Sequence, residues 1–81
     1  MDPNTINLDY PIDFEGSKLS EITLRRPKVG DISRASSKAK GEIPTAIELT
    51  AILSGLPPAA IEDLDAADFA KLQETVAGFL G

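Results

Sequence analysis

The sequence contains no cysteine and no histidine. Without cysteine, the chain has no disulfide and no thiolate nucleophile. Without histidine, it also lacks the commonest general base, and the two absences together remove the usual zinc and haem ligands. The sequence therefore predicts that the chain is not an enzyme and holds no metal or cofactor.

Aromatic residues and long apolar runs are also scarce. One tyrosine, three phenylalanines and no tryptophan leave little surface for stacking on bases or sugars. No segment approaches the roughly 20 consecutive apolar residues of a membrane span. The start, Met1 to Asn4, is acidic and polar, unlike the basic and apolar start of a signal peptide. We therefore expect a single domain of 81 residues in the cytoplasm, without a membrane partner.

Charge divides the chain into two unequal halves. Residues 1–41 carry six acids and seven bases, a net charge of +1, whereas residues 42–81 carry seven acids and one base, a net charge of −6. The acidic half disfavours duplex DNA or an anionic membrane as its partner. The bases gather between residues 25 and 40, and two interpretations stay open for them: they bind an anionic partner, or they are a solvated linker neutralised by the acidic half.

The amino-terminal third has the pattern of a β-hairpin. Residues 5–14 alternate between apolar and polar side chains, which predicts a half-buried strand. Its predicted inward residues are Ile6, Leu8, Tyr10, Ile12 and Phe14. Pro11 lacks a backbone donor and should lie at a sheet edge or break the strand. After turn residues 15–18, residues 19–26 predict a second strand with Ile22 and Leu24 facing inward.

Residues 28–42 are harder to interpret. Asp31 could cap a short helix that ends at Gly41, but serines and bases dilute its apolar pattern. A weak helix and a mobile connector both fit this stretch. A connector of this kind would lie among the least stable parts of the domain.

Residues 43–81 predict a helical unit. A first helix opens at Pro44 or Thr45 and stops at Gly55, and a short helix follows from Pro58 to Ile61. Asp65 then caps the last helix, where its side chain should accept from the Asp68 amide. Apolar residues recur on this helix at three- and four-residue steps, the spacing of one helical face. The predicted fold class is therefore α+β: a hairpin over residues 1–27, a basic connector or weak helix over 28–42, and two to three helices over 43–81.

A cluster of acidic residues near the start of the last helix allows two interpretations, a cation-binding site or helix capping. Glu62, Asp63, Asp65 and Asp68 lie close together in the sequence. A calcium loop needs oxygen ligands at alternate positions around a central glycine. Leu64, Ala66 and Ala67 interrupt that spacing and no glycine lies within it, so helix capping explains the cluster better.

Three short sequence motifs together resemble those of a known protein family. The first runs Ile-Thr-Leu-Arg-Arg-Pro-Lys-Val-Gly-Asp over residues 22–31. The others are Leu-Ser-Gly-Leu-Pro over 53–57 and Leu-Asp-Ala-Ala-Asp-Phe over 64–69. In order and spacing they resemble the Mu-like and P2-like tail assembly chaperones of contractile-tailed bacteriophages. The resemblance covers roughly residues 20–80.

The resemblance implies a protein partner and no catalytic residue. Such chaperones act in the bacterial host cytoplasm during virion morphogenesis, where they keep the helical tape measure protein soluble while the tail tube assembles around it. Several copies along one client, and hence a homo-oligomer, would fit that role. Two alternatives stay open: a small regulatory or nucleic-acid-binding protein with a helix-turn-helix-like pair around Leu56, and a structural tail component.

The apolar stripes of the last two helices are the candidate partner-binding residues. They exceed what two amphipathic helices and a hairpin can cover, and an uncovered remainder would bind an amphipathic helix. The candidates are Leu49, Ile52, Leu53, Leu56, Phe69, Leu72, Val76, Phe79 and Leu80, with Arg25 and Arg26 as weaker electrostatic contacts. Leu80 is the one expected to be most exposed, and the sequence leaves open which of the others form the core.

Overall fold

The computed structural model describes residues 4–81, and it shows a β-hairpin followed by helices. Its elements are β1 (Thr5–Phe14), β2 (Ser17–Thr23), α1 (Val29–Lys38), α2 (Glu42–Ser54), α3 (Pro58–Glu62) and α4 (Ala66–Leu80). The predicted α+β class is confirmed. The start Met1–Pro3, on which the expectation about a signal peptide drew, lies outside the described residues.

The hairpin turns through two residues with left-handed backbone conformations. Phe14 pairs with Ser17, so that Glu15 and Gly16 alone form the loop. Their φ angles are 51° and 79°. Positive φ at both loop residues is the mark of a type I′ turn, whose twist matches that of the paired strands.

An irregularity in β1 interrupts the predicted alternation. Asn7 pairs with Glu21 and Ile12 with Leu19, so four residues of β1 face a single residue of β2 between these pairs. Pro11 lies in this stretch, as expected for a residue that cannot donate a ladder bond. Within the irregular stretch Leu8 is buried while Tyr10 is 59% exposed, and beyond it Ile12 and Phe14 are again the half-buried side chains, as predicted. The prediction that Tyr10 faces inward was therefore wrong.

The second strand begins and ends earlier than predicted. It spans Ser17–Thr23 rather than residues 19–26. Leu24 N still donates to the Asn4 carbonyl opposite it in the hairpin, at 3.0 Å, whereas Arg25 N donates to the Leu53 carbonyl of α2 at 3.1 Å, so the chain has left the hairpin by Arg25. Leu24 is nevertheless completely buried, as its predicted inward position requires.

The uncertain stretch 28–42 contains a helix of ten residues, α1. Asp31 is not the N-cap residue of α1. Lys28 holds the N-cap position, and Asp31 lies one turn inside, where its carboxylate accepts from Lys28 N at 2.8 Å. Gly41 likewise does not terminate α1; it stands at the N-cap of α2, with φ of 98°.

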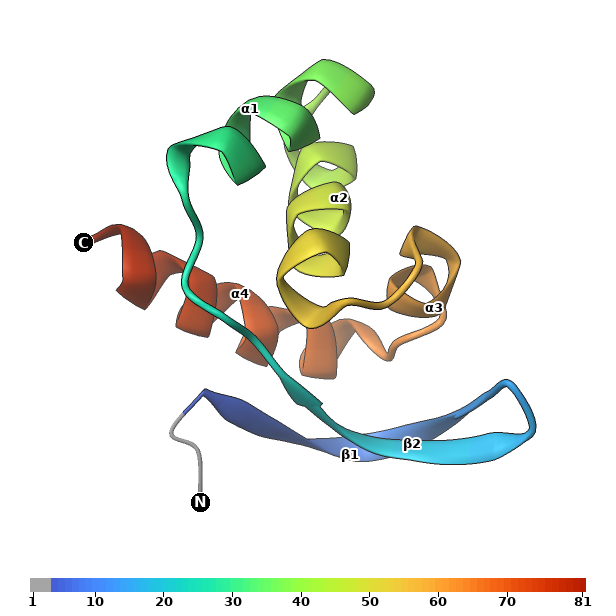
Figure 1. The fold of residues 1–81 in the computed structure, drawn as a ribbon. Coiled ribbons are helices and arrows are strands. Elements are labelled where there is room, and N and C mark those ends of the chain that lie inside the picture. The colour runs from blue at the N-terminus through green and yellow to red at the C-terminus, as the bar shows by residue number, and fades with distance from the viewer. Residues whose placement is uncertain (1–3) are drawn as a thin grey trace.

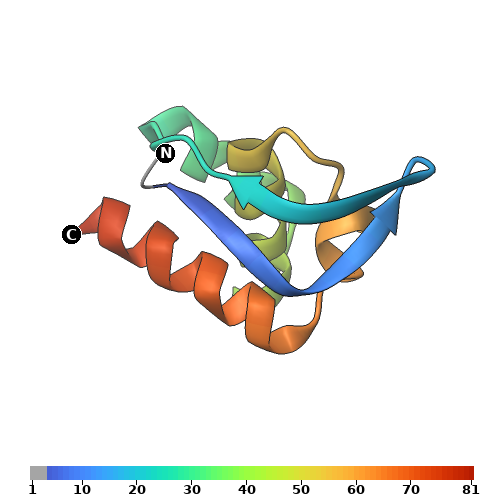
Figure 2. The same ribbon diagram turned by 90° about the horizontal axis from the view of Figure 1, so that it is seen from below.

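The helices lie together on one side of the hairpin (Figures 1 and 2). Helices α2 and α4 both contact it, whereas α1 packs on α2 and not on the sheet. The core is formed where these elements meet. Its largest fully buried apolar side chains are Leu24, Ile61 and Leu72. Thr50 of α2 is also fully buried, and its hydroxyl accepts from Gln73 Nε2 of α4 at 2.8 Å.

Two glycines are expected to respond in opposite ways to alanine. Gly55 ends α2 with φ of 74°, a left-handed conformation that costs an alanine about 1–2 kcal/mol. Gly78 lies within α4 with open space around its Cα, so alanine there should raise the stability by about 0.5–1 kcal/mol. Urea unfolding of the two variants measures both changes. A Gly55→Ala protein as stable as the parent would contradict the left-handed helix end.

Candidate interaction surfaces

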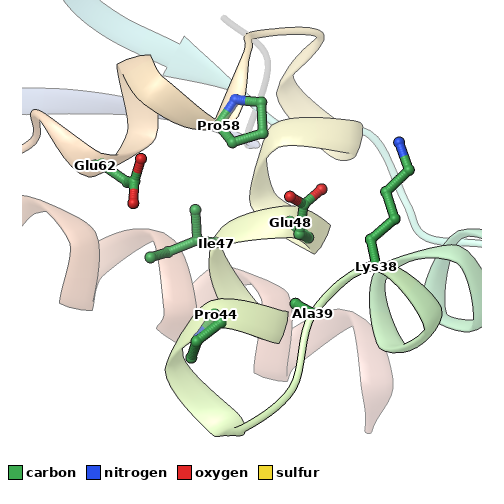
Figure 3. Close-up of a pocket in the computed structure, with 7 residues that line it drawn as sticks. All are labelled: Lys38, Ala39, Pro44, Ile47, Glu48, Pro58 and Glu62. Carbon is green, nitrogen blue, oxygen red and sulfur yellow. The ribbon is translucent and has the colours of Figure 1, made fainter.

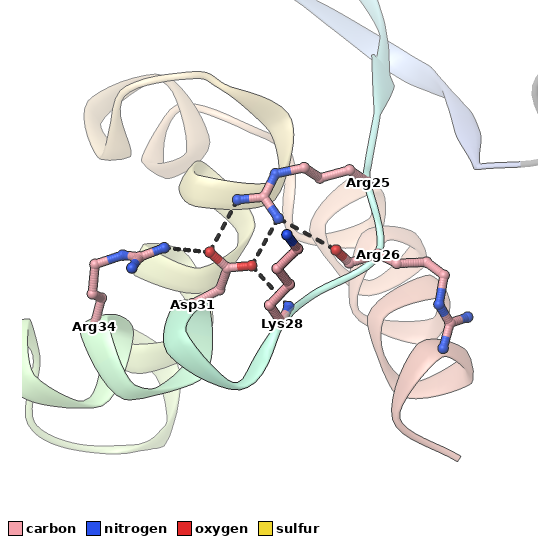
Figure 4. Close-up of polar contacts among 5 residues, drawn as sticks. All are labelled: Arg25, Arg26, Lys28, Asp31 and Arg34. Carbon is pink, nitrogen blue, oxygen red and sulfur yellow. Dashed lines mark hydrogen bonds and ion pairs between the residues drawn. The ribbon is translucent and has the colours of Figure 1, made fainter.

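The segment from Arg25 to Asp31, together with Arg34, forms a cluster of hydrogen bonds and ion pairs (Figure 4). The Arg25 guanidinium binds both oxygens of Asp31, with Nη1–Oδ2 at 2.7 Å and Nη2–Oδ1 at 3.0 Å. Arg34 Nη2 contacts the same Oδ1 from the next turn of α1. The Asp31 side chain is only 2% exposed, yet each of its oxygens accepts two hydrogen bonds, one of them from Lys28 N. The cluster ties the chain leaving β2 to the first turn of α1.

The same cluster sets the ionisation of Asp31. The hydrogen bonds from Arg25 and from the Lys28 amide lower the pKa of Asp31 far below its usual value, against the opposing effect of burial. The bond to Asp31 likewise raises the pKa of Arg25. Charge-assisted bidentate pairs of this kind are among the stronger hydrogen bonds in proteins. Both charges are therefore maintained across the physiological range of pH.

Arg26 connects the same segment to the other end of the chain. Its guanidinium carbon lies 5.5 Å from the centre of the Phe79 ring, and its Nη2 donates to the Phe79 carbonyl at 3.4 Å. A cation over an aromatic face is attracted by the ring quadrupole. Arg25 and Arg26 thus both have partners within the chain. Their role toward another molecule stays a prediction.

A second buried carboxylate joins α4 to the irregular part of β1. Asp68 is completely buried and accepts from the amides of Asp9, at 2.9 Å, and Tyr10, at 3.0 Å. Lys71, one turn later, lies 3.3 Å from Asp68 and 3.2 Å from Asp9, and donates to the Asn7 carbonyl at 2.8 Å. Asp68 and Lys71 therefore satisfy backbone groups that the irregularity leaves unpaired.

Opposing effects act on the charge of Asp68. Burial is the largest single effect and disfavours the carboxylate, but the amides of Asp9 and Tyr10 and the ammonium of Lys71 together outweigh it, so the pKa of Asp68 is lowered. The pKa of Lys71 is raised, chiefly by its bond to Asp9. The sequence assigned Asp68 only to an acidic cluster explained by helix capping. It also placed the Asp65 side chain on the Asp68 amide, whereas Asp65 accepts from Ala67 N at 3.0 Å.

The predicted partner-binding residues fall into three groups by burial. Leu49, Leu53, Leu72 and Val76 are buried in the core, with at most 8% of each exposed. Ile52, Leu56, Phe69 and Phe79 are half-buried and pack against that core. Leu80 is 59% exposed, as expected from its position near the end of the stripe. The surface of this set is therefore concentrated at the carboxyl end of α4, where Phe79 and Leu80 lie beside Arg26.

Other exposed apolar residues were not singled out from the sequence. Val29 of α1 is 84% exposed and Ile43 of α2 is 61% exposed. Both lie in the first turn of their helices, where the direction of each side chain depends on which residue is the N-cap. Because the sequence predicted these two helix starts incorrectly, the periodicity could not identify which side chains would point outward.

A hollow of about 310 Å³ lies where α1, α2 and α3 meet (Figure 3). Its lining residues are Lys38, Ala39, Pro44, Ile47, Glu48, Pro58 and Glu62. The lining combines aliphatic surface with charged groups. Within residues 4–81, no group of three or more acidic side chains is arranged to hold a metal ion.

The comparison with protein families identifies the class of this chain. The family model described as "Phage tail assembly chaperone proteins, E, or 41 or 14" matches residues 5–81. The match includes both strands and all four helices, and the chain belongs to this family of phage tail assembly chaperones. Neither the curated proteins nor the solved structures contain a match to the chain.

Family membership implies that the partner of this chain is a protein and suggests a non-enzymatic role. This membership agrees with the resemblance of the three sequence motifs to tail assembly chaperones. Over the residues that the structure describes, each helix is too short or too polar to cross a bilayer.

Proposed function

We propose that this chain binds an amphipathic helical segment of a client and keeps it soluble during tail assembly in the bacterial cytoplasm. The client is the tape measure protein, and several copies of the chaperone act along it. Membership of the tail assembly chaperone family supports a protein partner. The resemblance of the sequence motifs to Mu-like and P2-like chaperones supports the choice of client.

The observation that carries the proposal is the exposed apolar end of α4. Leu80 leaves 59% of its surface in contact with solvent, next to the half-buried Phe79. Arg26 lies over the Phe79 ring and adds a cation at the edge of this surface. An amphipathic helix places apolar residues three and four positions apart, which suits a short apolar ridge of this kind.

The remaining candidate residues enter the proposal in two roles. Ile52, Leu56 and Phe69 keep part of their surface accessible and can widen the contact. Leu49, Leu53, Leu72 and Val76 form the packing beneath it. Aspartate at Leu53 would unfold the domain rather than report on binding, because only 3% of that side chain is exposed.

Replacing Leu80 by aspartate is expected to weaken capture of a tape measure segment by at least about ten-fold, since burying a leucine contributes about 1.5–3 kcal/mol. The folded state should persist because Leu80 is largely exposed. Co-expression with overlapping tape measure fragments, followed by pull-down and calorimetry, measures the loss. Circular dichroism melting of the same samples checks the fold.

The matched control is Ala77→Asp, which places the same charge on an exposed position of α4. It should leave capture unchanged. Equal capture by the parent and by Leu80→Asp would refute the proposed contact. Equal losses in both variants would assign the effect to charge on the helix rather than to the apolar ridge.

No observation favours the two alternatives. A recognition helix needs basic side chains for phosphates, and neither α2 nor α3 carries arginine or lysine. Mass spectrometry of purified particles would detect the chain if it were a structural tail component.

A further inference from the structure

The hollow between α1, α2 and α3 combines apolar walls with unpaired acids (Figure 3). Pro44, Ile47 and Pro58 supply aliphatic surface, and Glu48 and Glu62 lie on either side of Ile47. Neither carboxylate takes part in a hydrogen bond or ion pair with another described residue. We call this region, defined by these five residues, the acidic hollow.

The other end of α1 carries the complementary features. Val29 is 84% exposed and Ile32 is 36% exposed, and their spacing of three residues puts them on one side of the helix. The exposed Lys28 precedes them. We call Lys28, Val29 and Ile32 the basic face. Arg25 and Arg34 nearby share the single carboxylate of Asp31, so positive charge is in excess here.

These two surfaces cannot meet within one molecule. Helix α1 has ten residues, or about 15 Å, and the basic face lies at its start while the hollow lies at its end. The two surfaces are complementary: exposed aliphatic side chains with cations lie at one end, and an aliphatic hollow with two unpaired carboxylates and one lysine lies at the other.

We propose that the chain associates head to tail, with the basic face of one copy seated in the acidic hollow of the next. The occupant of the hollow is thus a second copy of this chain. Because the two contacting surfaces differ, the association is heterologous and extends from copy to copy instead of closing as a symmetric dimer. Lys38 at the rim of the hollow opposes the incoming cation and keeps the contact weak.

This inference deepens the several-copy part of the proposed function but can fail independently of it. Client binding was assigned to the apolar end of α4, whereas the contact between copies uses α1, α2 and α3. The test uses the purified full chain with no client present.

Sedimentation equilibrium at low ionic strength is the first measurement. The average mass should rise continuously with protein concentration and fall when salt is raised from about 50 to 500 mM, because exposed charges are then screened. A monomer at all concentrations up to about 1 mM would overturn the proposal, since even weak contacts of about 4 kcal/mol are populated there. An average mass that levels off at two copies would also overturn it.

Charge reversal provides the sharper test. Glu48→Lys with Glu62→Lys makes the hollow basic. Lys28→Glu with Ser33→Glu makes the basic face acidic, since Ser33 is exposed on α1 four residues after Val29. Each double variant alone should associate at least about ten-fold more weakly, because like charges then face each other. An equimolar mixture of the two should associate again, because opposite charges face each other at every contact between the variants. A mixture that stays monomeric while both proteins fold would refute the contact.

Three controls complete the experiment. Asp13→Lys with Glu21→Lys changes the net charge equally at exposed hairpin positions and should preserve association. Lys38→Gln should strengthen it. Glu62→Lys alone, at an exposed side chain, replaces the double variant if that protein does not fold. If the hollow variants lose client capture while their self-association is unchanged, the hollow binds the client and the proposal is wrong.

Discussion

Replacing Leu72 by alanine is expected to lower the free energy of unfolding by about 2–5 kcal/mol. Leu72 is completely buried at the centre of α4, where α4 packs against β1 and α2. Truncation removes its apolar contacts and leaves a cavity that the surrounding elements fill only in part. For a domain of this size the total stability is about 4–12 kcal/mol, so the loss is a large share of it.

Thermal melting followed by circular dichroism measures this effect. Each kcal/mol should shift the midpoint by roughly 4–8 °C in a domain of 60–100 residues. Leu80→Ala is the matched control, because it removes the same atoms from an exposed position of the same helix. A small shift for Leu72→Ala, similar to that of the control, would show that α4 does not pack as described.

Removal of the Asp31 carboxylate is expected to have the second large effect. Asp31→Ala leaves the Lys28 amide unpaired and removes the anion that Arg25 and Arg34 share. Loss of these bonds frees the segment between β2 and α1, and the melting midpoint should fall on the order of 10 °C. Asp13→Ala, at an exposed carboxylate of β1, should change the midpoint little.

The pH dependence of the free energy of unfolding shows how much of the stabilisation by Asp31 comes from its negative charge and how much from the size and hydrogen bonds of its side chain. The pKa of Asp31 is lowered in the folded state from 3.8, so below pH 4 the unfolded chain binds protons more readily than the folded one. The stabilisation from Asp31 is therefore complete above about pH 5 and decreases as the pH falls below about 4.

Asp68 has a lowered pKa as well and adds to this loss in acid. Asp31→Asn keeps an acceptor but not the charge, so its stability should fall less steeply between about pH 5 and 2 than that of the parent. Parallel pH profiles for the parent and Asp31→Asn would contradict an ionised Asp31 in the folded protein.

The fold could be predicted wherever local signals agreed. The alternation over 5–14 and the Gly-containing loop predicted the hairpin. The glycine after α2 and the capping aspartate before α4 predicted two helix boundaries. Local chemistry dominates at these points, so a single sequence contains enough information.

The errors have a common physical cause. The irregular stretch of β1, which exposes Tyr10, is bonded to Asp68, and Asp68 lies 59 residues from Asp9 in the sequence. The start of α1 depends on the Asp31 carboxylate, which accepts bonds from the amide of the N-cap residue Lys28 and from the Arg25 guanidinium. Such contacts form only in the folded chain, so the pattern of apolar residues within one segment cannot predict them.

The candidate surface was predictable only in part. The position of Leu80 near the end of an apolar stripe was enough to indicate its exposure, which the structure confirms at 59%. The exposure of Val29 depends on the start of α1, and the hollow depends on how three helices meet. Neither could be deduced without the tertiary arrangement.

The bonds between Asp68 and the amides of Asp9 and Tyr10 also affect how the chain folds during its synthesis. β1 receives these bonds only after the ribosome has released α4, so in a nascent chain that holds the hairpin alone these two amides donate to water instead. Long-range contacts of this kind slow folding because the intervening loop must close first. The domain should therefore complete its fold only once α4 has emerged from the ribosome, and ribosome-bound chains that stop before residue 66 should remain sensitive to protease.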